Sequence, residues 1–194
     1  NISIDLIVGW PDQTTDDIQQ ALTAIARLDI QHVSIYMLML EQGTPLETDV
    51  NDGDVALPTD DISATLYETI QHGLTDLGFR QYEISNFAKP GFESQHNLAY
   101  WSHHSHKGFG AGAASLDAET RIQNSKDIDE YVSDWREGRD IEHLSRKDVL
   151  NERLMMGLRT PEGIESSDIE HVPTVHIDML IDKKLLTSCG RRIR

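Results

Sequence analysis

The sequence predicts an α/β fold in which the last strands of an incomplete parallel sheet are followed by a small, mostly α-helical C-terminal domain. Short apolar runs alternate with amphipathic stretches through the first part of the chain, in the order strand, helix, strand, helix, strand. Connections of this length imply parallel pairing with right-handed crossovers. From about residue 116 the pattern changes to short helices, so we expect domains over residues 1–115 and 116–194.

The first strand is predicted over residues 2–9, where ISIDLIVG is mostly apolar and β-branched, as in a strand buried on both faces of a parallel sheet. Gly9 and Pro11 end it. Thr14 or Thr15 then caps a helix whose apolar residues recur at helical spacing. The run VSIYMLML at residues 33–40 predicts a second buried strand.

Thr59 is expected to cap a further helix, and Gly78 lies where a helix C-terminus favours a left-handed residue. A third strand is expected to begin at residues 82–84. Three strands are too few to close a barrel, so they would form the last part of a sheet whose opening strands are absent. Ser125 and Ser145 are expected to cap helices of the second domain, and residues 191–194 resemble the start of a strand.

Composition excludes several classes of partner. The 194 residues hold 17 Lys and Arg against 33 Asp and Glu, a net charge of -16, which argues against nucleic acid and against anionic membranes. No apolar stretch approaches membrane-spanning length. The single cysteine, Cys189, rules out an internal disulfide and cannot hold an iron–sulfur cluster, so we expect a reduced, cytoplasmic protein. Asn1 in place of Met indicates a fragment of a longer chain.

The most informative stretch is residues 81–101, QYEISNFAKPGFESQHNLAYW. Its end brings together His96, Asn97, Tyr100 and Trp101, which are an imidazole, an amide, a phenol and an indole. A flat metallated macrocycle needs such groups: an axial nitrogen for the iron, aromatic faces and hydrogen-bond donors. The alternative interpretation is a surface loop anchored by two aromatic residues. Three nearby cations are candidates for pairing with carboxylate arms: Arg80, Lys89 and Lys107.

Other candidates carry weaker signals. Asp5 is a lone carboxylate in an apolar strand, and if buried it should meet a donor or cap a neighbouring loop. Residues 108–114, GFGAGAA, permit close backbone approach but match no nucleotide fingerprint. His103, His104 and His106 suggest a metal site, but no acidic residue lies close enough in sequence to orient them.

Several motifs together carry a resemblance to a known family. IDLIVGWPDQT, SIYMLMLEQGTP, QYEISNFAKPG, HNLAYW and GFGAGA, followed by SKDIDEYVSDW and LNERLMMGLRTPEGI, occur in the order found in HemW-type heme chaperones. This family has a radical-SAM scaffold and is related to the oxygen-independent coproporphyrinogen III oxidase. The resemblance covers essentially the whole chain.

The resemblance implies a heme motif at His96, Asn97, Tyr100 and Trp101, with His96 as the axial ligand of the heme iron. It also implies S-adenosylmethionine contacts at Asp5, Met39 and Ala114 (the last a histidine in many members). The fold would be the end of a partial (β/α) radical-SAM barrel. The family's three-cysteine motif for the [4Fe-4S] cluster has no counterpart in this chain, so we expect the chain alone to be inactive in radical chemistry.

Three functions remain open at this point. The favoured hypothesis is a chaperone that holds heme or a porphyrin and passes it to an acceptor protein. The alternative is the oxidase, which decarboxylates propionate side chains in porphyrin biosynthesis, so whether the chain is an enzyme stays undecided. The third is a structural half-domain without a ligand of its own.

Overall fold

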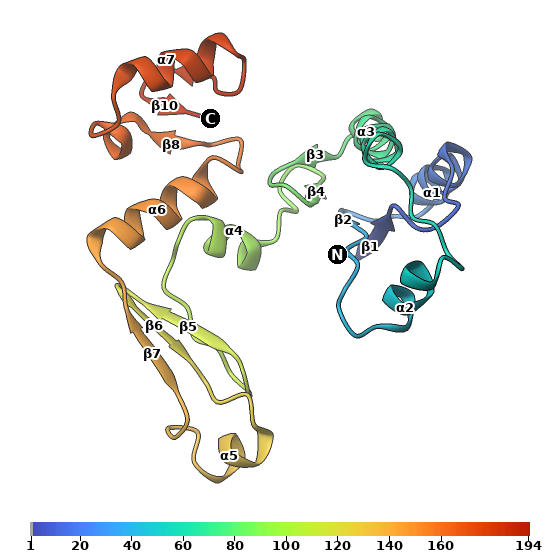
Figure 1. Ribbon diagram of the computed structural model, residues 1–194. Helices are drawn as coiled ribbons and strands as arrows, with labels where there is room; N and C mark the ends of the chain where they lie inside the picture. The colour runs from blue at the N-terminus through green and yellow to red at the C-terminus, as the bar shows by residue number, and fades with distance from the viewer. Residues whose placement is uncertain (1) are drawn as a thin grey trace. The chain divides into compact units, whose positions relative to one another are not determined.

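A computed structural model describes residues 2–194, which form two compact units divided between Glu93 and Ser94 (Figure 1). Asn1, on which the expectation of a fragment rested, lies outside the described residues. The division falls earlier than the boundary at 115/116 expected from the sequence, because residues 94–115 make their contacts within the second unit.

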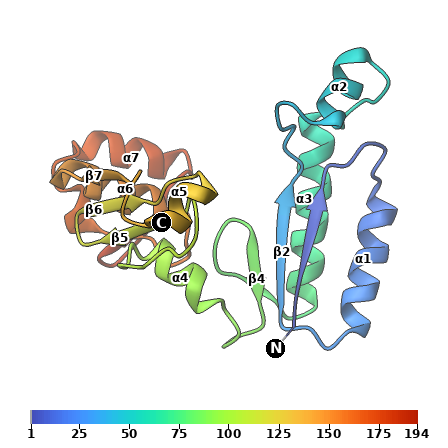
Figure 2. The same cartoon turned by 90° about the horizontal axis from the view of Figure 1, so that it is seen from below.

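The first unit is a four-stranded sheet with helices along it. Its elements are β1 (Ser3–Val8), α1 (Thr15–Arg27), β2 (His32–Met37), α2 (Pro45–Asp52), α3 (Asp60–Asp76), β3 (Arg80–Gln81) and β4 (Asn86–Ala88), with strand order β1-β2-β4-β3. Figure 2 shows α1 and α3 running alongside β1 and β2. Val8, Val33 and Ile35 of the strands pack with the apolar faces of both helices in the buried core.

Pairing of β1 with β2 is parallel, as expected, with Asp5 opposite Ser34. The predicted third strand at residues 82–84 is wrong. These residues form a bend between β3 and β4, and β4 returns antiparallel to β2, with His32 opposite Ala88. The buried carboxylate of Glu83 accepts hydrogen bonds from the backbone N–H of Ser85 at 3.1 Å and from the side chain of Asn86, which stabilises this bend.

The second unit is more mixed than the mostly helical domain that the sequence suggested. It contains α4 (Gln95–Trp101), β5 (Ala114–Asp117), β6 (Thr120–Gln123), α5 (Ile128–Ser133), β7 (Asp140–His143), α6 (Arg146–Gly157), β8 (Ile164–Glu165), the 3₁₀ helix η1 (Ser166–Ile169), α7 (Thr174–Asp182), β9 (Ser188–Cys189) and β10 (Arg192–Ile193). The strands form two antiparallel sheets in the orders β5-β6-β7 and β8-β10-β9. The expected strand near the end of the chain is β10.

Helix ends follow local sequence rules closely. Thr14 caps α1 in a reciprocal capping box with Asp17, Thr59 caps α3, and Ser145 forms a second capping box with Asp148. Gly78 has the left-handed φ of 85° expected after α3. The expected cap at Ser125 is wrong, because Asp127 caps α5 and Ser125 instead donates to Glu130.

No helix within residues 2–194 has both the length and the apolar character needed to cross a membrane.

Candidate functional site

The short helix α4 carries the four residues of the HNLAYW motif. Ser94 starts the helix by accepting the backbone N–H of Asn97 at 3.3 Å. Residues four apart on a helix share a face. His96 therefore lies beside Tyr100, and Asn97 lies on the same strip as Trp101.

His96 and Tyr100 form an exposed aromatic pair. Their ring centroids are 4.6 Å apart in an edge-on arrangement, and His106 contacts the other side of the pair by packing edge-on to Tyr100 at 4.5 Å. His96 is exposed, and Tyr100 retains 40% of its accessible surface. An imidazole in this position is open to an incoming ligand and has an aromatic ring at its side.

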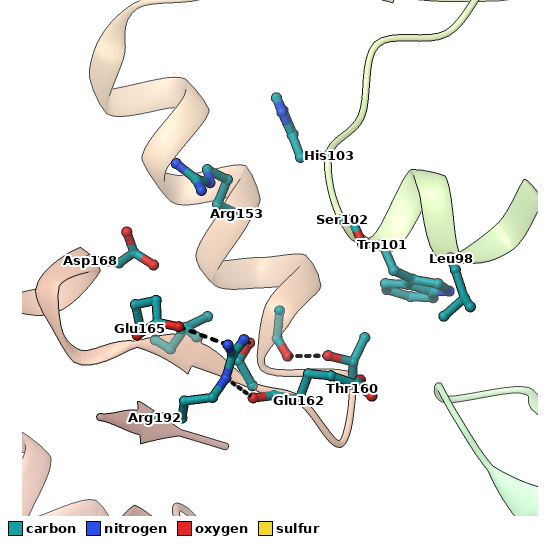
Figure 3. A pocket seen from close by; sticks show the side chains of 13 residues that line it. Leu98, Trp101, Ser102, His103, Arg153, Thr160, Glu162, Glu165, Asp168 and Arg192 are labelled. Atoms are coloured by element: carbon teal, nitrogen blue, oxygen red, sulfur yellow. Dashed lines mark hydrogen bonds and ion pairs between the residues drawn. The ribbon is translucent and has the colours of Figure 1, made fainter. Parts of the chain in front are cut away.

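Trp101 lies in a cavity of about 430 Å³ in the second unit. Figure 3 shows Trp101 and Leu98 of α4 on one side of this cavity and Arg153 of α6 on another. Strands β8 and β10, the turn at residues 160–163 and Asp168 of η1 also contribute to the lining. The volume lies within the range typical of small-molecule pockets. Asn97 is half-buried and does not line it.

Cations in this cavity are only partly available. Arg192 donates to the carboxylate of Glu165 at 2.7 Å and to the carbonyl oxygens of Glu162 and Gly163. Arg153 has no ion-pair partner among the described residues 2–194, so it is the better candidate for an anionic group of a ligand. The structure thus places His96 with Tyr100 on one surface of α4 and Trp101 in an adjoining cavity.

A polar network anchors the segment after α4. His103 and Glu152 share a hydrogen bond of 2.9 Å between Nε2 and Oε2. The other oxygen of Glu152 accepts from Arg121 at 2.5 Å, and Arg121 also donates to Glu142 at 2.6 Å. Burial raises the pKa of Glu152, but the hydrogen bonds and charges of Arg121 and His103 outweigh it, so the pKa lies below its ordinary value.

This network was missed from the sequence. No acidic residue lies close to these histidines in sequence, but Glu152 reaches His103 across 49 residues of chain. The metal hypothesis for His103, His104 and His106 gains no support, since residues 2–194 contain no group of three or more His, Cys, Asp or Glu that could hold a metal ion.

The residues implied for S-adenosylmethionine lie in different units. Asp5 and Met39 belong to the first unit and Ala114 begins β5 in the second. Asp5, which would need a hydrogen-bond donor if it were buried, is exposed, on the side of β1 opposite the buried Val8. Met39 follows β2 and is 73% exposed. A common cofactor site for these three residues stays a prediction.

The expected cations differ in availability. Arg80 and Lys89 belong to the first unit, where the Lys89 ammonium lies 5.5 Å from the centre of the Phe79 ring. Lys107 belongs to the second unit and pairs with Asp117 at 3.4 Å.

The fold is that of a radical-SAM scaffold. The structure of coproporphyrinogen III oxidase (HemN) from Escherichia coli, a radical SAM enzyme, superimposes with a TM-score of 0.71 and 19% sequence identity. The superposition covers 99% of this chain and 50% of that one, and it shows the fold alone. No protein-family model matches the chain.

Sequence comparison shows that the chain is related to HemW proteins. The chain is 36% identical over 168 residues to the heme chaperone HemW of Bacillus subtilis, covering 84% of this chain and 44% of the relative. It is 34% identical to HemW of Lactococcus lactis, covering 100% and 54%. It is 35% identical to a mitochondrial radical S-adenosyl methionine domain-containing protein 1 of Danio rerio, covering 84% and 39%.

The resemblance found in the motifs is therefore confirmed, and this is a HemW-type sequence. The chain spans about half the length of the curated relatives that it matches.

Proposed function

We propose that this chain is part of a heme chaperone in which α4 presents His96 to the iron of a bound heme. In this proposal the chain holds heme within a radical-SAM scaffold and passes it to an acceptor protein. The observation that carries the proposal is the exposed pair of His96 and Tyr100, with ring centroids 4.6 Å apart. The HemW relatives, which are named as heme chaperones, support it.

The chemistry of α4 suits heme as a cargo. A neutral imidazole nitrogen is a standard axial ligand for heme iron, and aromatic rings pack against the macrocycle. His96 is exposed, so binding would require no opening of the core. The phenol of Tyr100 would lie at the side of the ligating ring and restrict its rotation.

The contribution of S-adenosylmethionine is part of the same proposal. Asp5 would accept hydrogen bonds from the cofactor, and the backbones at Met39 and Ala114 would contact it. The residues present do not fit a [4Fe-4S] cluster, because the sequence has one cysteine and clusters of this kind need several thiolates. We therefore assign no radical step to these residues. The near absence of cysteine also leads us to place the protein in the cytoplasm.

Heme titration of the chain and of its His96→Ala variant tests the proposal. His72 of α3 is an exposed helical histidine in the other unit, so His72→Ala is a matched control. We expect His96→Ala to weaken heme binding about tenfold or more and to shift the Soret band, because the axial bond is lost. His72→Ala should bind like the parent chain. Unchanged affinity and an unchanged Soret band in His96→Ala would contradict the proposal.

A further inference from the structure

A second cavity, of about 440 Å³, lies in the second unit beside β5, β6 and α5, and it shares no lining residue with the cavity beside α4. Figure 1 shows α5 near the end of the β5-β6-β7 sheet. Ser115 and Ile122 both line the cavity and are directly opposite in the β5–β6 pairing, so they face the same side of the sheet. Successive residues of a strand alternate faces, so Ala114 faces the other side. Ala114, the predicted cofactor contact in this unit, does not line the cavity.

Hydrogen bonds fix the backbone that forms one wall of this cavity. The buried side chain of Asn124 donates to the carbonyl oxygens of Gly110 at 3.0 Å and Gly108 at 3.4 Å. The N–H of Gly110 donates to the hydroxyl of Tyr131, and the N–H of Gly108 donates to Ser115 Oγ, each at 3.0 Å. The wall is ordered before any ligand arrives, which reduces the entropy cost of binding.

Aromatic side chains supply flat apolar surface. Phe109 is 87% exposed and Trp135 is 47% exposed, and both line the cavity together with Tyr131. Exposing a phenylalanine to this extent leaves apolar area in water that a ligand would cover. The rings favour a planar ligand, because such a body stacks with its whole face.

The charge of the lining is opposite to that of the chain. The net charge of the sequence is -16, but no Asp or Glu lines the cavity, whereas Arg139 and Lys107 do. The Arg139 guanidinium lies 4.0 Å from the centre of the Trp135 ring. Its Nε is buried and makes no hydrogen bond within residues 2–194. The guanidinium also makes no ion pair within residues 2–194, so its charge is available to an anion in the cavity.

We propose that this cavity binds a planar organic anion, a flat aromatic or conjugated molecule that carries a carboxylate or a phosphate. The flat body lies against Trp135 and Phe109, and the anionic group accepts hydrogen bonds from Arg139. Lys107 contributes a second positive charge, shared with Asp117 at 3.4 Å. A cation is repelled, and a neutral analogue loses the interaction with Arg139. None of the four motif residues on α4 lines this cavity.

Calorimetric titration of the full chain with two pairs of probes tests the site. Adenosine 5′-monophosphate is compared with adenosine, and 2-naphthoate with 2-naphthamide, so that each acid has a neutral counterpart. We expect at least one acid to bind about tenfold more tightly than its neutral counterpart. The pair that succeeds distinguishes a phosphate ligand from a carboxylate ligand.

Two neighbouring arginines provide a matched pair of variants. Arg136 also lies over the Trp135 ring, at 4.6 Å, but it does not line the cavity. Arg139→Met should weaken binding of the acid about tenfold and leave that of the neutral counterpart unchanged, whereas Arg136→Met should keep the affinity within about twofold. Thermal unfolding checks that each variant is folded. Lys107→Met changes a largely exposed side chain and should weaken binding of the acid by a few-fold even if Arg139→Met does not fold.

Three results would overturn the proposal. The first is that neither acid binds the parent chain at about 1 mM, and the second is that each acid binds no more tightly than its neutral counterpart. The third is that Arg136→Met weakens binding as much as Arg139→Met, which would indicate a general effect of surface charge.

Discussion

Replacing Glu152 with Gln should destabilise the second unit, because a neutral glutamine loses the negative charge that strengthens both hydrogen bonds of the carboxylate. Glu152 accepts from Arg121 at 2.5 Å and from His103 at 2.9 Å, and its side chain is only 19% exposed. A glutamine side chain has one acceptor oxygen and one donor amide. The amide group must therefore face either Arg121, donor against donor, or His103, which accepts it only if the imidazole carries its proton on Nδ1. In either orientation the negative charge that pairs with Arg121 is lost.

The expected loss of stability in Glu152→Gln follows from the hydrogen-bond partners of Glu152 and from their shielding from solvent. A hydrogen bond to a charged group contributes about 1.5–3 kcal/mol, and some solvent access reduces this, so we expect Glu152→Gln to lower the free energy of unfolding by about 1–3 kcal/mol. Glu142 binds the same guanidinium at 2.6 Å but is 56% exposed, so Glu142→Gln is a matched control. It should cost about 0–1 kcal/mol, as exposed ion pairs do.

Urea denaturation followed by tryptophan fluorescence measures both variants. In a Trp10→Phe background the remaining tryptophans, Trp101 and Trp135, both lie in the second unit. The pKa of Glu152 is lowered on folding, so its contribution is present above its ordinary value of 4.5 and is lost as the pH falls through the folded pKa. The difference in the free energy of unfolding between the parent chain and Glu152→Gln should shrink in that pH range. Equal losses for Glu152→Gln and Glu142→Gln at neutral pH would refute this reasoning.

Three further predictions concern stability. Burial lowers the pKa of His32 below 6.5 against the opposing charges of Asp5 and Glu83. The stability that the neutral imidazole contributes is therefore full above pH 6.5 and is lost as the pH falls through the folded pKa. The free energy of unfolding should fall from pH 7.5 to 5.5 less steeply in His32→Gln than in the parent, and parallel curves would contradict this. Phe87→Ala should cost about 3–5 kcal/mol in urea denaturation because Phe87 is fully buried, whereas Phe92→Ala, at a side chain 42% exposed, should change stability by under about 1 kcal/mol. Gly163 and Gly190 both have left-handed φ, of 65° and 63°, but a Cβ on Gly163 would meet the carbonyl of Ile193 whereas one on Gly190 would meet open space. Gly163→Ala should therefore lower the thermal midpoint of unfolding more than Gly190→Ala. Equal shifts would show that φ alone decides the cost.

Local signals predicted much of the first unit. The parallel strands β1 and β2 were visible as apolar β-branched runs, and the caps at Thr14, Thr59 and Ser145 follow from side chains that bond within the next turn. The bend at residues 82–85 was not predictable in this way. Its sequence is strand-like, and the chain turns because the buried Glu83 bonds with Asn86, a tertiary arrangement that periodicity does not reveal.

The second unit shows where such signals fail. Strands β6 and β7 have four residues each, too short for alternation to be distinguished from other patterns, and their pairing joins Ile122 to Ile141 across the intervening α5. A pairing of this kind is set by tertiary contacts. From the alternating charged and apolar side chains of such short segments we predict helices or loops, but small sheets form there.

The candidate site was predicted in part. The motif residues on α4 were identified from their chemistry, and the structure shows His96 beside Tyr100 but places Trp101 in a separate cavity. The link from His103 to Glu152 depends on α6 folding back along α4, so no local pattern contains it. The apolar run around Asp5 predicts a strand buried on both faces, but within the described residues only the side of β1 that carries Val8 is covered.

The most direct test of the central claim is pulsed electron paramagnetic resonance of the ferric heme complex with ¹⁵N-labelled histidine. This measurement detects an imidazole nitrogen bound to the iron. The account predicts a ¹⁵N coupling in the parent chain that disappears in His96→Ala and persists in His72→Ala. A coupling that survives unchanged in His96→Ala would show that another residue binds the iron and would contradict the assignment of α4 as the heme-binding helix.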